Sequence, residues 1–294
     1  MNLISFLFSI LVFISGIIQA HAYLADPLTT KLQSTSGAGV ATLHMTESTL
    51  LNPASVVFFN QSAFSYQRET TSLEEESKSR SDSYQSSGTD IISLIDTSSS
   101  LHGGYTYQYQ NGEDGYRKRY SISLAAAISK DAGLGLIYRY TDEDSSVIDD
   151  SYSQVVLGFT KVISNKLLIG FTIVDPNQEV SDYFKYTGGI HLTVNDFFDV
   201  IADIGSGDVH NKDKESFTAW ALQISSFESL YLRYGQFHNK LENRKGTSWG
   251  ISWVGPKLSL EYSYKISELI SNSSDTLLLT EELHTNSLSL TMIF

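Results

Sequence analysis

The side chains best suited to bind a ligand are charged residues and one histidine that alternate with apolar positions. Carboxylate, guanidinium and ammonium groups bind polar partners through ion pairs and charge-assisted hydrogen bonds. Most of them would form ion pairs inside a polar lumen that hold a plug segment or neighbouring strands, and a minority could line a solute path. The set comprises Arg139, His191, Asp199, Asp203, Arg233, Glu261 and Lys265.

Catalytic and metal chemistry find little support. The chain has no G-x-S-x-G, no H-E-x-x-H and no phosphate loop. His191 is a weak candidate for a metal ligand because no second ligand lies at a useful spacing. A barrel protease would place its acids and base in outer loops, where Asp149, Asp150 and His210 lie, but loop acids are usually only solvated. We expect no enzyme, no metal and no cofactor.

The overall composition restricts the class of partner. The 294 residues carry a net charge of −13, which argues against nucleic acid, because phosphates are bound by clusters of Lys and Arg. The 17 Tyr and 15 Phe residues suit strands and aromatic belts at a membrane interface. There are no cysteines, which excludes disulfides, thiolate metal sites and a lipid-modified N-terminal cysteine.

The N-terminus has the features of an export signal. An apolar run over residues 3–18 precedes Ala20-His21-Ala22, the small-residue pattern that signal peptidase cleaves. The run is shorter than the roughly 20 residues that a membrane-spanning helix needs. No Lys or Arg precedes it, and a retained anchor is the alternative. We predict a signal peptide over residues 1–22 and a mature chain that begins near Tyr23.

From residue 101 onward, segments of about ten residues alternate between apolar and polar side chains. Leu258, Leu260 and Tyr262 alternate with Ser259 and Glu261, for example. In a strand the two sets point to opposite faces. The pattern predicts strands over 101–110, 115–128, 133–142, 151–163, 166–174, 183–194, 198–205, 216–225, 229–238, 246–254, 257–267 and 281–294.

The predicted connections alternate between short turns and longer polar loops. The long ones are expected at 143–150, 175–182, 206–215, 239–245 and 268–280. Outer-membrane barrels have short periplasmic turns and longer external loops. If the short turns are periplasmic, the last strand ends in the periplasm and the strand over 101–110 runs outward. Residues 56–68 also alternate as a strand, so residues 69–100 must hold a solvated loop over 69–85 and one inbound strand, expected near 87–96. The fold class is therefore an all-β transmembrane antiparallel barrel of about fourteen strands, with twelve as the fallback.

The outer face of this barrel should be apolar and aromatic. We expect it to carry Tyr105, Tyr107, Tyr109, Tyr138, Tyr140, Tyr262, Trp220, Trp249 and Trp253, with those near strand ends at the lipid headgroups. The last strand ends on Leu288, Leu290, Met292 and Phe294 in alternation with Ser and Thr. A terminal aromatic on an alternating strand resembles the signal that the barrel-assembly machinery recognises, which makes this machinery an expected partner.

The segment before the first strand resembles the FadL family of outer-membrane transporters for hydrophobic compounds. A Gly/Ala stretch with Gly37 and Gly39 is followed by Asn52, Pro53 and Ala54 just before the barrel. TraF-type and PorV-type barrels share this opening. In the FadL family the segment is a hatch inside a fourteen-stranded barrel. The resemblance implies a hatch over residues 23–55 and a barrel over 56–294, and an ordinary loop entering a barrel is the alternative.

The resemblance implies transport of small fatty-acid-like or aromatic molecules across the outer membrane of a Gram-negative bacterium. Ligand would enter from outside, reach the lumen and leave after a shift of the hatch around Asn52–Ala54. The expected surroundings are outer-membrane lipid and lipopolysaccharide. The alternative is a non-transporting barrel that acts in secretion, surface assembly or adhesion, and a soluble secreted β-sandwich is a third possibility.

Overall fold

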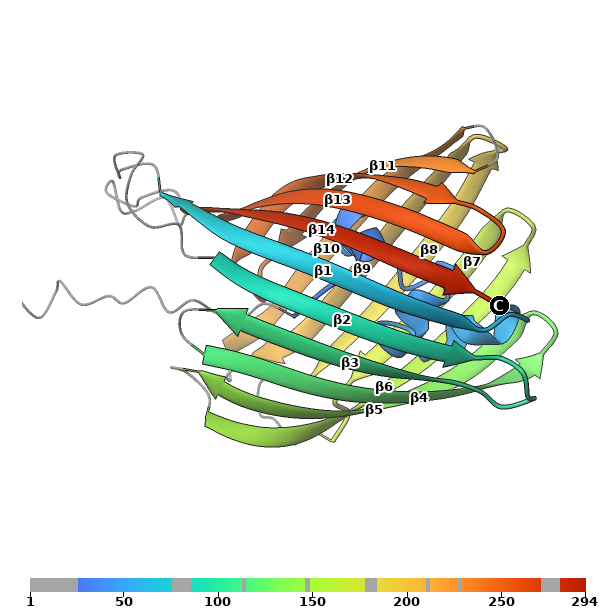
Figure 1. The fold of residues 1–294 in the computed structure, drawn as a ribbon, viewed down its shortest axis with the longest axis horizontal. Helices are drawn as coiled ribbons and strands as arrows, with labels where there is room; N and C mark the ends of the chain where they lie inside the picture. The colour runs from blue at the N-terminus through green and yellow to red at the C-terminus, as the bar shows by residue number, and fades with distance from the viewer. Residues whose placement is uncertain are drawn as a thin grey trace, which may run out of the picture.

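The chain forms one closed antiparallel barrel of fourteen strands, each paired with its neighbours in sequence (Figure 1). The computed structural model describes residues 26–75, 86–112, 115–145, 149–177, 184–209, 212–226, 229–270 and 281–294. The predicted fourteen-stranded barrel is confirmed. The predicted signal peptide lies outside the described residues.

The strands differ in length but follow one another without interruption around the barrel. They are β1 Ala63–Glu75, β2 Ser86–Asp96, β3 His102–Gly112, β4 Gly115–Ser129, β5 Ala132–Ser145, β6 Asp149–Ser164, β7 Leu167–Val174, β8 Lys185–Asn195, β9 Phe198–Val209, β10 Lys212–Ser226, β11 Leu230–Asn239, β12 Arg244–Val254, β13 Leu258–Leu269 and β14 Glu281–Ile293.

Pairing of the first strand with the last closes the ring. β1 and β14 run antiparallel in unbroken register from Ala63 opposite Ile293 to Glu75 opposite Glu281. Closure leaves no free strand edge, which a lipid environment requires because lipid satisfies no backbone hydrogen bond.

The twelve strands predicted after residue 100 correspond to β3–β14, and the strand expected near 87–96 is β2. The prediction for the first strand was wrong at its start, because residues 53–58 form a 3-10 helix, η2 (Pro53–Phe58). Proline at its first position fits a helix start, and the Asn52 side chain caps it by accepting from the Ala54 amide. The segment inside the barrel therefore continues past residue 55, and the wall begins at Ala63.

Three of the predicted loops are strand over a large part of their length. β1 continues to Glu75 within the expected loop 69–85. Residues 146–148 alone separate β5 from β6, and residues 210–211 alone separate β9 from β10. The polar ends of these strands pair with each other, for example Asp144 with Asp149, so polarity did not mark the end of the strand.

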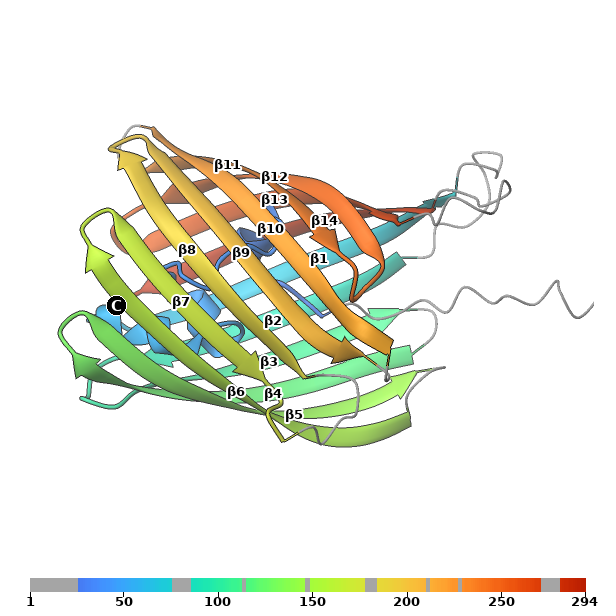
Figure 2. The same ribbon diagram turned by 180° about the vertical axis from the view of Figure 1, so that it is seen from behind.

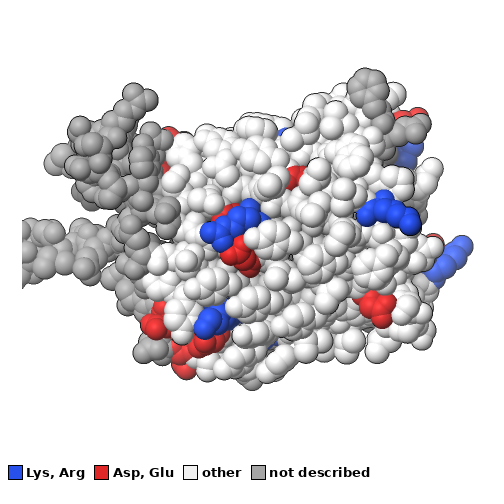
Figure 3. Space-filling model, in the orientation of Figure 1, with Lys and Arg blue, Asp and Glu red and all other residues white. Residues whose placement is uncertain are grey.

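Side chains alternate between an exposed outer face and a buried inner face. In β4, Tyr120, Ile122 and Leu124 are exposed while Ser121 and Ser123 are buried. Of the predicted outer aromatics, Tyr105, Tyr138, Tyr140, Trp220, Trp249 and Trp253 are exposed, and Tyr107, Tyr109 and Tyr262 are half-buried on the same face. The side of this surface seen in Figure 3 is largely uncharged apart from small groups of Lys, Arg, Asp and Glu.

Outer-face tyrosines bond to polar side chains nearby. Tyr66 donates to Asp90 at 2.8 Å and Tyr262 donates to Asn286 at 2.8 Å. Tyr138 donates to Ser153 at 3.1 Å. An apolar ring with a polar tip suits the boundary between lipid tails and headgroups.

Residues 26–62 lie inside the barrel and form a plug, drawn in blue in Figures 1 and 2. The plug contains the helix α2 (Thr30–Ser34), the 3-10 helix η1 (Thr46–Thr49) and η2. α2 contacts β11–β14, whereas η2 contacts β3–β6, so the plug reaches across the lumen. No helix in the described part of the chain is long and apolar enough to cross a membrane.

An outward charge tests which surface faces lipid. Leu222 lies on the outer face between Trp220 and Ile224, and Ile128 lies on the outer face at the end of β4. We expect Leu222→Arg to lower the unfolding free energy by about 2–4 kcal/mol and Ile128→Arg by about 1 kcal/mol or less. Urea unfolding in lipid vesicles measures both, and equal costs would contradict the assignment of the lipid face.

Candidate functional site

Asn52 joins two segments of the plug to the barrel wall. Its amide nitrogen donates to the Val40 carbonyl at 2.6 Å and to Thr160 Oγ1 of β6 at 2.9 Å. Its amide oxygen accepts from the Ala54 backbone at 3.1 Å. The side chain is buried, so each of these bonds replaces a partner that water would otherwise supply.

Glycines in the wall form a seat for Asn52-Pro53-Ala54. A Cβ added at Gly158 would lie 2.3 Å from Asn52 Oδ1, and one added at Gly135 would lie 2.7 Å from the Pro53 carbonyl carbon. At Gly170 it would lie 2.2 Å from the Val40 oxygen. The plug therefore approaches the wall of β5–β7 closely enough to exclude any side chain there.

Asp203 of β9 holds the Gly/Ala segment of the plug. Its carboxylate accepts from the Gly39 amide at 2.7 Å and from the Val40 amide at 2.9 Å. Gly37 adopts φ +89°, a backbone conformation that favours glycine. A Cβ at Gly39 would lie 2.3 Å from Leu32 Cδ2. These glycines let the plug turn and present two amides to one carboxylate.

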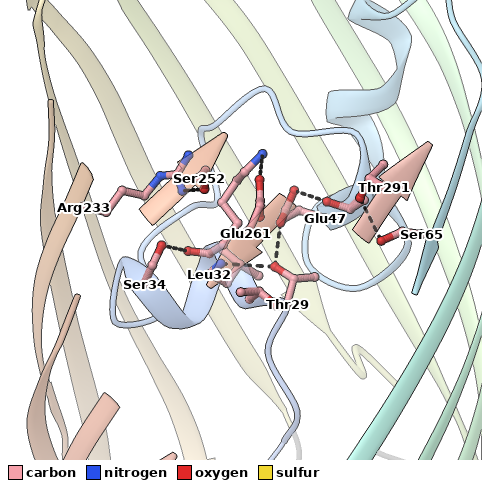
Figure 4. Close-up of polar contacts among 12 residues, drawn as sticks. Thr29, Leu32, Ser34, Glu47, Ser65, Arg233, Ser252, Glu261 and Thr291 are labelled. Atoms are coloured by element: carbon pink, nitrogen blue, oxygen red, sulfur yellow. Dashed lines mark hydrogen bonds and ion pairs between the residues drawn. The ribbon is translucent and has the colours of Figure 1, made fainter. Parts of the chain in front are cut away.

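The α2 side of the plug contacts the wall through hydroxyls, one ion pair and the Gln67 side chain of β1, which accepts from the Thr30 amide and donates to the Leu28 carbonyl, both at 2.7 Å. Lys31 pairs with Glu261 of β13 at 3.1 Å. Thr30 and Ser287 hydroxyls lie 2.7 Å apart, Ser36 and Ser248 hydroxyls 2.8 Å apart. Figure 4 shows Glu261 together with Thr29 and Glu47, and Thr29 donates to Glu47 at 2.6 Å. Thr29 thereby links α2 to η1.

The opposite side of the plug packs against the barrel wall through apolar side chains. Val56 packs with Ile95 and Ala125, and Met45 and Val57 cover the cluster. His102 Nδ1 lies 3.0 Å from the Val56 carbonyl oxygen. The plug therefore has one packed side, at β2–β7, and one hydroxyl-rich side, at β12–β14.

A chain of polar contacts crosses β8–β12 on the inner wall. His191 lies 3.5 Å from Asp199, which accepts from Gln223 at 2.7 Å. Arg233 donates to Gln223 at 2.7 Å and also to Ser252. The nearby plug residue His44 has its pKa held well below the usual value by burial and by Lys31, Arg233 and His191, so its imidazole is neutral.

The remaining predicted lumen residues also point inward. Arg139 donates to the Leu50 carbonyl of the plug, and the Lys265 ammonium lies 4.3 Å from the centre of the Phe237 ring. Three of the seven predicted residues thus contact the plug directly: Arg139, Asp203 and Glu261.

Two inward residues that the sequence analysis did not single out are Arg117 and Arg119 of β4. Extending the alternation of residues 120–128 by three positions toward the N-terminus would have placed both on the inner face. Their plug partner, Asp26, has no comparable sequence signal. Within the described ranges, no group of three or more His, Cys, Asp or Glu side chains is placed to hold a metal.

The outer face of the last strand carries the predicted assembly residues. Leu288, Leu290 and Met292 are exposed, and Phe294 ends the chain with 72% exposure. Its backbone exchanges two hydrogen bonds of 3.0 Å with Ser62, next to the seam between β14 and β1.

The barrel with its plug resembles solved bacterial channels. The CymD monoaromatic hydrocarbon channel matches with a TM-score of 0.69 at 12% identity, over 93% of this chain and 99% of that one. The Ralstonia pickettii toluene transporter TbuX matches with a TM-score of 0.67 at 11% identity, over 92% and 99%. A Pseudomonas aeruginosa FadL homologue matches with a TM-score of 0.63 at 10% identity, over 90% and 98%.

These matches confirm the predicted FadL-like fold. No protein-family model matches the sequence, and no curated protein matches it either.

The glycine seat is testable because the chain offers a matched control. Gly188 meets no neighbour closer than 4.0 Å, whereas Gly158 lies against Asn52. We expect Gly158→Ala to lower the free energy of unfolding by about 1–3 kcal/mol, because the added methyl group overpacks against Asn52. Gly188→Ala should change it by about 0.5 kcal/mol or less.

The rate of trypsin cleavage after Lys31 reports this change, because Lys31 is the sole Lys or Arg between Asp26 and Ser62. Faster cleavage in Gly158→Ala than in Gly188→Ala is the expected result. Equal rates would show that the plug does not depend on this contact.

Proposed function

We propose that this chain is an outer-membrane channel that passes small hydrophobic molecules inward through a plugged barrel. The observation that carries the proposal is the combination of a closed fourteen-stranded barrel with a plug across its lumen, matched in the CymD channel over 93% of this chain. A barrel that served only as a scaffold would not need a plug seated so closely in its wall.

The outer membrane is the location that the surface supports. Leu, Ile, Tyr and Trp side chains cover the outward positions of the strands, and burying this surface in lipid is favourable. The predicted signal peptide over residues 1–22 supplies export. Lipid and lipopolysaccharide would then contact the outer face.

The ligand class follows from the similar channels and from the lumen. One of these is described as a monoaromatic hydrocarbon channel and another as a toluene transporter. We infer that this chain takes aromatic or fatty-acid-like molecules of similar size. The mixed lumen, in which Phe237 stands beside Lys265, suits a ligand with an apolar body and one polar group.

Release into the periplasm requires the plug to move away from the barrel wall. The two sides of the plug differ in how easily they can separate from it. Asn52-Pro53-Ala54 is wedged against glycines, and separating it would leave buried amide groups unpaired. The α2 side is held by hydroxyl pairs, by Lys31–Glu261 and by the Gln67 side chain, which accepts from the Thr30 amide, and water can replace these contacts. We infer that the plug turns about Asn52–Ala54 and opens at α2, with Gly37 and Gly39 supplying the flexible link.

Uptake in cells tests the function. A deletion strain should take up labelled toluene and labelled octanoate more slowly than its parent, and the wild-type gene should restore the rate. A variant carrying Thr30→Cys and Ser287→Cys, which replaces hydroxyls 2.7 Å apart, should restore uptake only when reduced. Unchanged uptake of both compounds on deletion would contradict transport.

We further propose that the barrel-assembly machinery recognises the last strand through Leu288, Leu290, Met292 and Phe294. Deleting Phe294 should lower the amount of assembled barrel several-fold, because the aromatic end of the strand is lost, while Phe294→Tyr should preserve it. The assembled fraction is read on unheated gels, where folded barrels migrate apart from heated ones. Equal assembly of both variants would contradict this role.

A further inference from the structure

A row of charged and aromatic side chains crosses the outer face of β1–β5. Each member lies opposite the next in the strand pairing, in the order Arg68, Asp90, Tyr109, Lys118 and Asp142. The residues before and after each member in sequence are buried, so the row itself faces outward. Figure 3 shows charged groups on this side of the barrel, on a surface that is otherwise largely uncharged.

The row lies at the limit of the apolar surface. Toward the end of the barrel that holds Phe294, expected in the periplasm, the next outward residues are Tyr66, Ile92, Tyr107, Tyr120 and Tyr140. Toward the opposite end they are Thr70, Gly88, Asn111, Tyr116 and Asp144. Aromatic rings followed by polar residues are typical of the level of the lipid headgroups. The row therefore lies where the outer leaflet has its phosphates.

The guanidinium group of Arg68 is held in place but remains open to the outside. It pairs with Asp90, and Tyr66 donates to the same carboxylate at 2.8 Å. A Cβ added at Gly88 would lie 2.9 Å from Arg68 Nη2, so glycine at this position makes room for the group. The Arg68 side chain is 52% exposed, and among the described residues it donates to Asp90 alone. Because a guanidinium group has five N–H donors, donors remain for a second acceptor.

The ammonium group of Lys118 has no ion-pair partner in the described part of the chain. Asp142 lies opposite Lys118 on β5, but the two side chains do not form an ion pair. The Lys118 Nζ atom lies 4.5 Å from the centre of the Tyr116 ring, which is the next outward residue toward the external end. Lys245 of β12 also faces outward, but it pairs with Glu268 at 3.6 Å. The β1–β4 side is therefore the side that presents cationic groups with donors to spare.

We propose that Arg68 and Lys118 bind the phosphates of one lipopolysaccharide molecule in the outer leaflet. The two residues are three strands apart in one row, so their Cα atoms lie about 14 Å apart along the sheet. Lipopolysaccharide has a disaccharide with a phosphate at each end, which offers one anion to each cation. Tyr109 lies between them, and its ring gives the sugars an apolar surface.

The neighbouring groups suit this ligand. Asp90 and Tyr66 fix the direction of the guanidinium group, and an arginine held in this way can bind phosphate through two parallel hydrogen bonds. The acyl chains would extend over the outward apolar residues on the periplasmic side of the row, such as Ile92 and Ile122. The inference takes the outer-membrane location from the proposed function and is otherwise independent of transport.

Binding of lipid A, the phosphorylated anchor of lipopolysaccharide, tests the site. The purified full-length protein in detergent would be titrated with lipid A carrying both phosphates, and native mass spectrometry would measure the bound fraction. We expect one tightly bound molecule. Arg68→Gln and Lys118→Gln should each weaken binding about fivefold, and the double variant about 25-fold. Lys130→Gln and Lys257→Gln, in turns at the opposite end of the barrel, are the matched controls and should change nothing.

Asp90→Asn separates a lipid site from an ion pair that only supports the barrel. If Arg68 served only to pair with Asp90, Arg68→Gln and Asp90→Asn would lower stability alike and leave lipid A binding unchanged. In the proposed site, Asp90→Asn removes a carboxylate beside the bound phosphate, so lipid A should bind at least as tightly as to wild type. Unheated gels confirm that each variant is folded.

Two results would overturn the site. The first is equal affinity of the wild type and the Arg68→Gln/Lys118→Gln variant for lipid A. The second is equal binding of lipid A with and without its phosphates, which would show a general contact with lipid. Uptake of toluene and octanoate by the deletion strain carrying the wild-type gene tests transport separately. Failure of the lipid site therefore leaves the proposed function standing, and loss of transport would leave the lipid site standing.

Discussion

The constraint on which this structure depends is that lipid offers no hydrogen bonds to a backbone. Every amide and carbonyl in a spanning segment must find its partner within the protein, and a closed ladder of antiparallel strands achieves this without a helix. Closure through β1 and β14 also fixes which side chains face lipid and which face the lumen. The inward set is then free to be polar, so binding residues can lie along the whole wall.

The closed wall creates a second requirement, because a barrel this wide needs its lumen filled or blocked. Here residues 26–62 fill it, and the wall adapts by using glycine where the plug backbone comes closest, at Gly135, Gly158 and Gly170. Polar groups of the plug are satisfied by single inward residues such as Asp203 and Glu261. The result is a plug that is packed on one side and hydroxyl-bonded on the other.

Much of the barrel wall can be predicted from the local alternation of apolar and polar residues in the sequence. Alternation over β12 and β13 locates those strands because the two faces meet different solvents. The same reasoning failed at Pro53–Phe58, where a cap and a proline override an apolar stretch, and at Asp144, where a polar strand end pairs above the lipid. Partners across the lumen, such as Asp26 with Arg119, join positions far apart in sequence, and no periodicity connects them.

The charges of the lumen show what the inner wall must do for the plug. A uniformly apolar lumen would leave the polar groups of the plug without partners. Arginines paired with carboxylates, as Arg117 is with Glu143, satisfy each other's charge within the wall. Because one of those carboxylates, Asp26, belongs to the plug and not to the wall, the electrostatic balance of the lumen also depends on where the plug is.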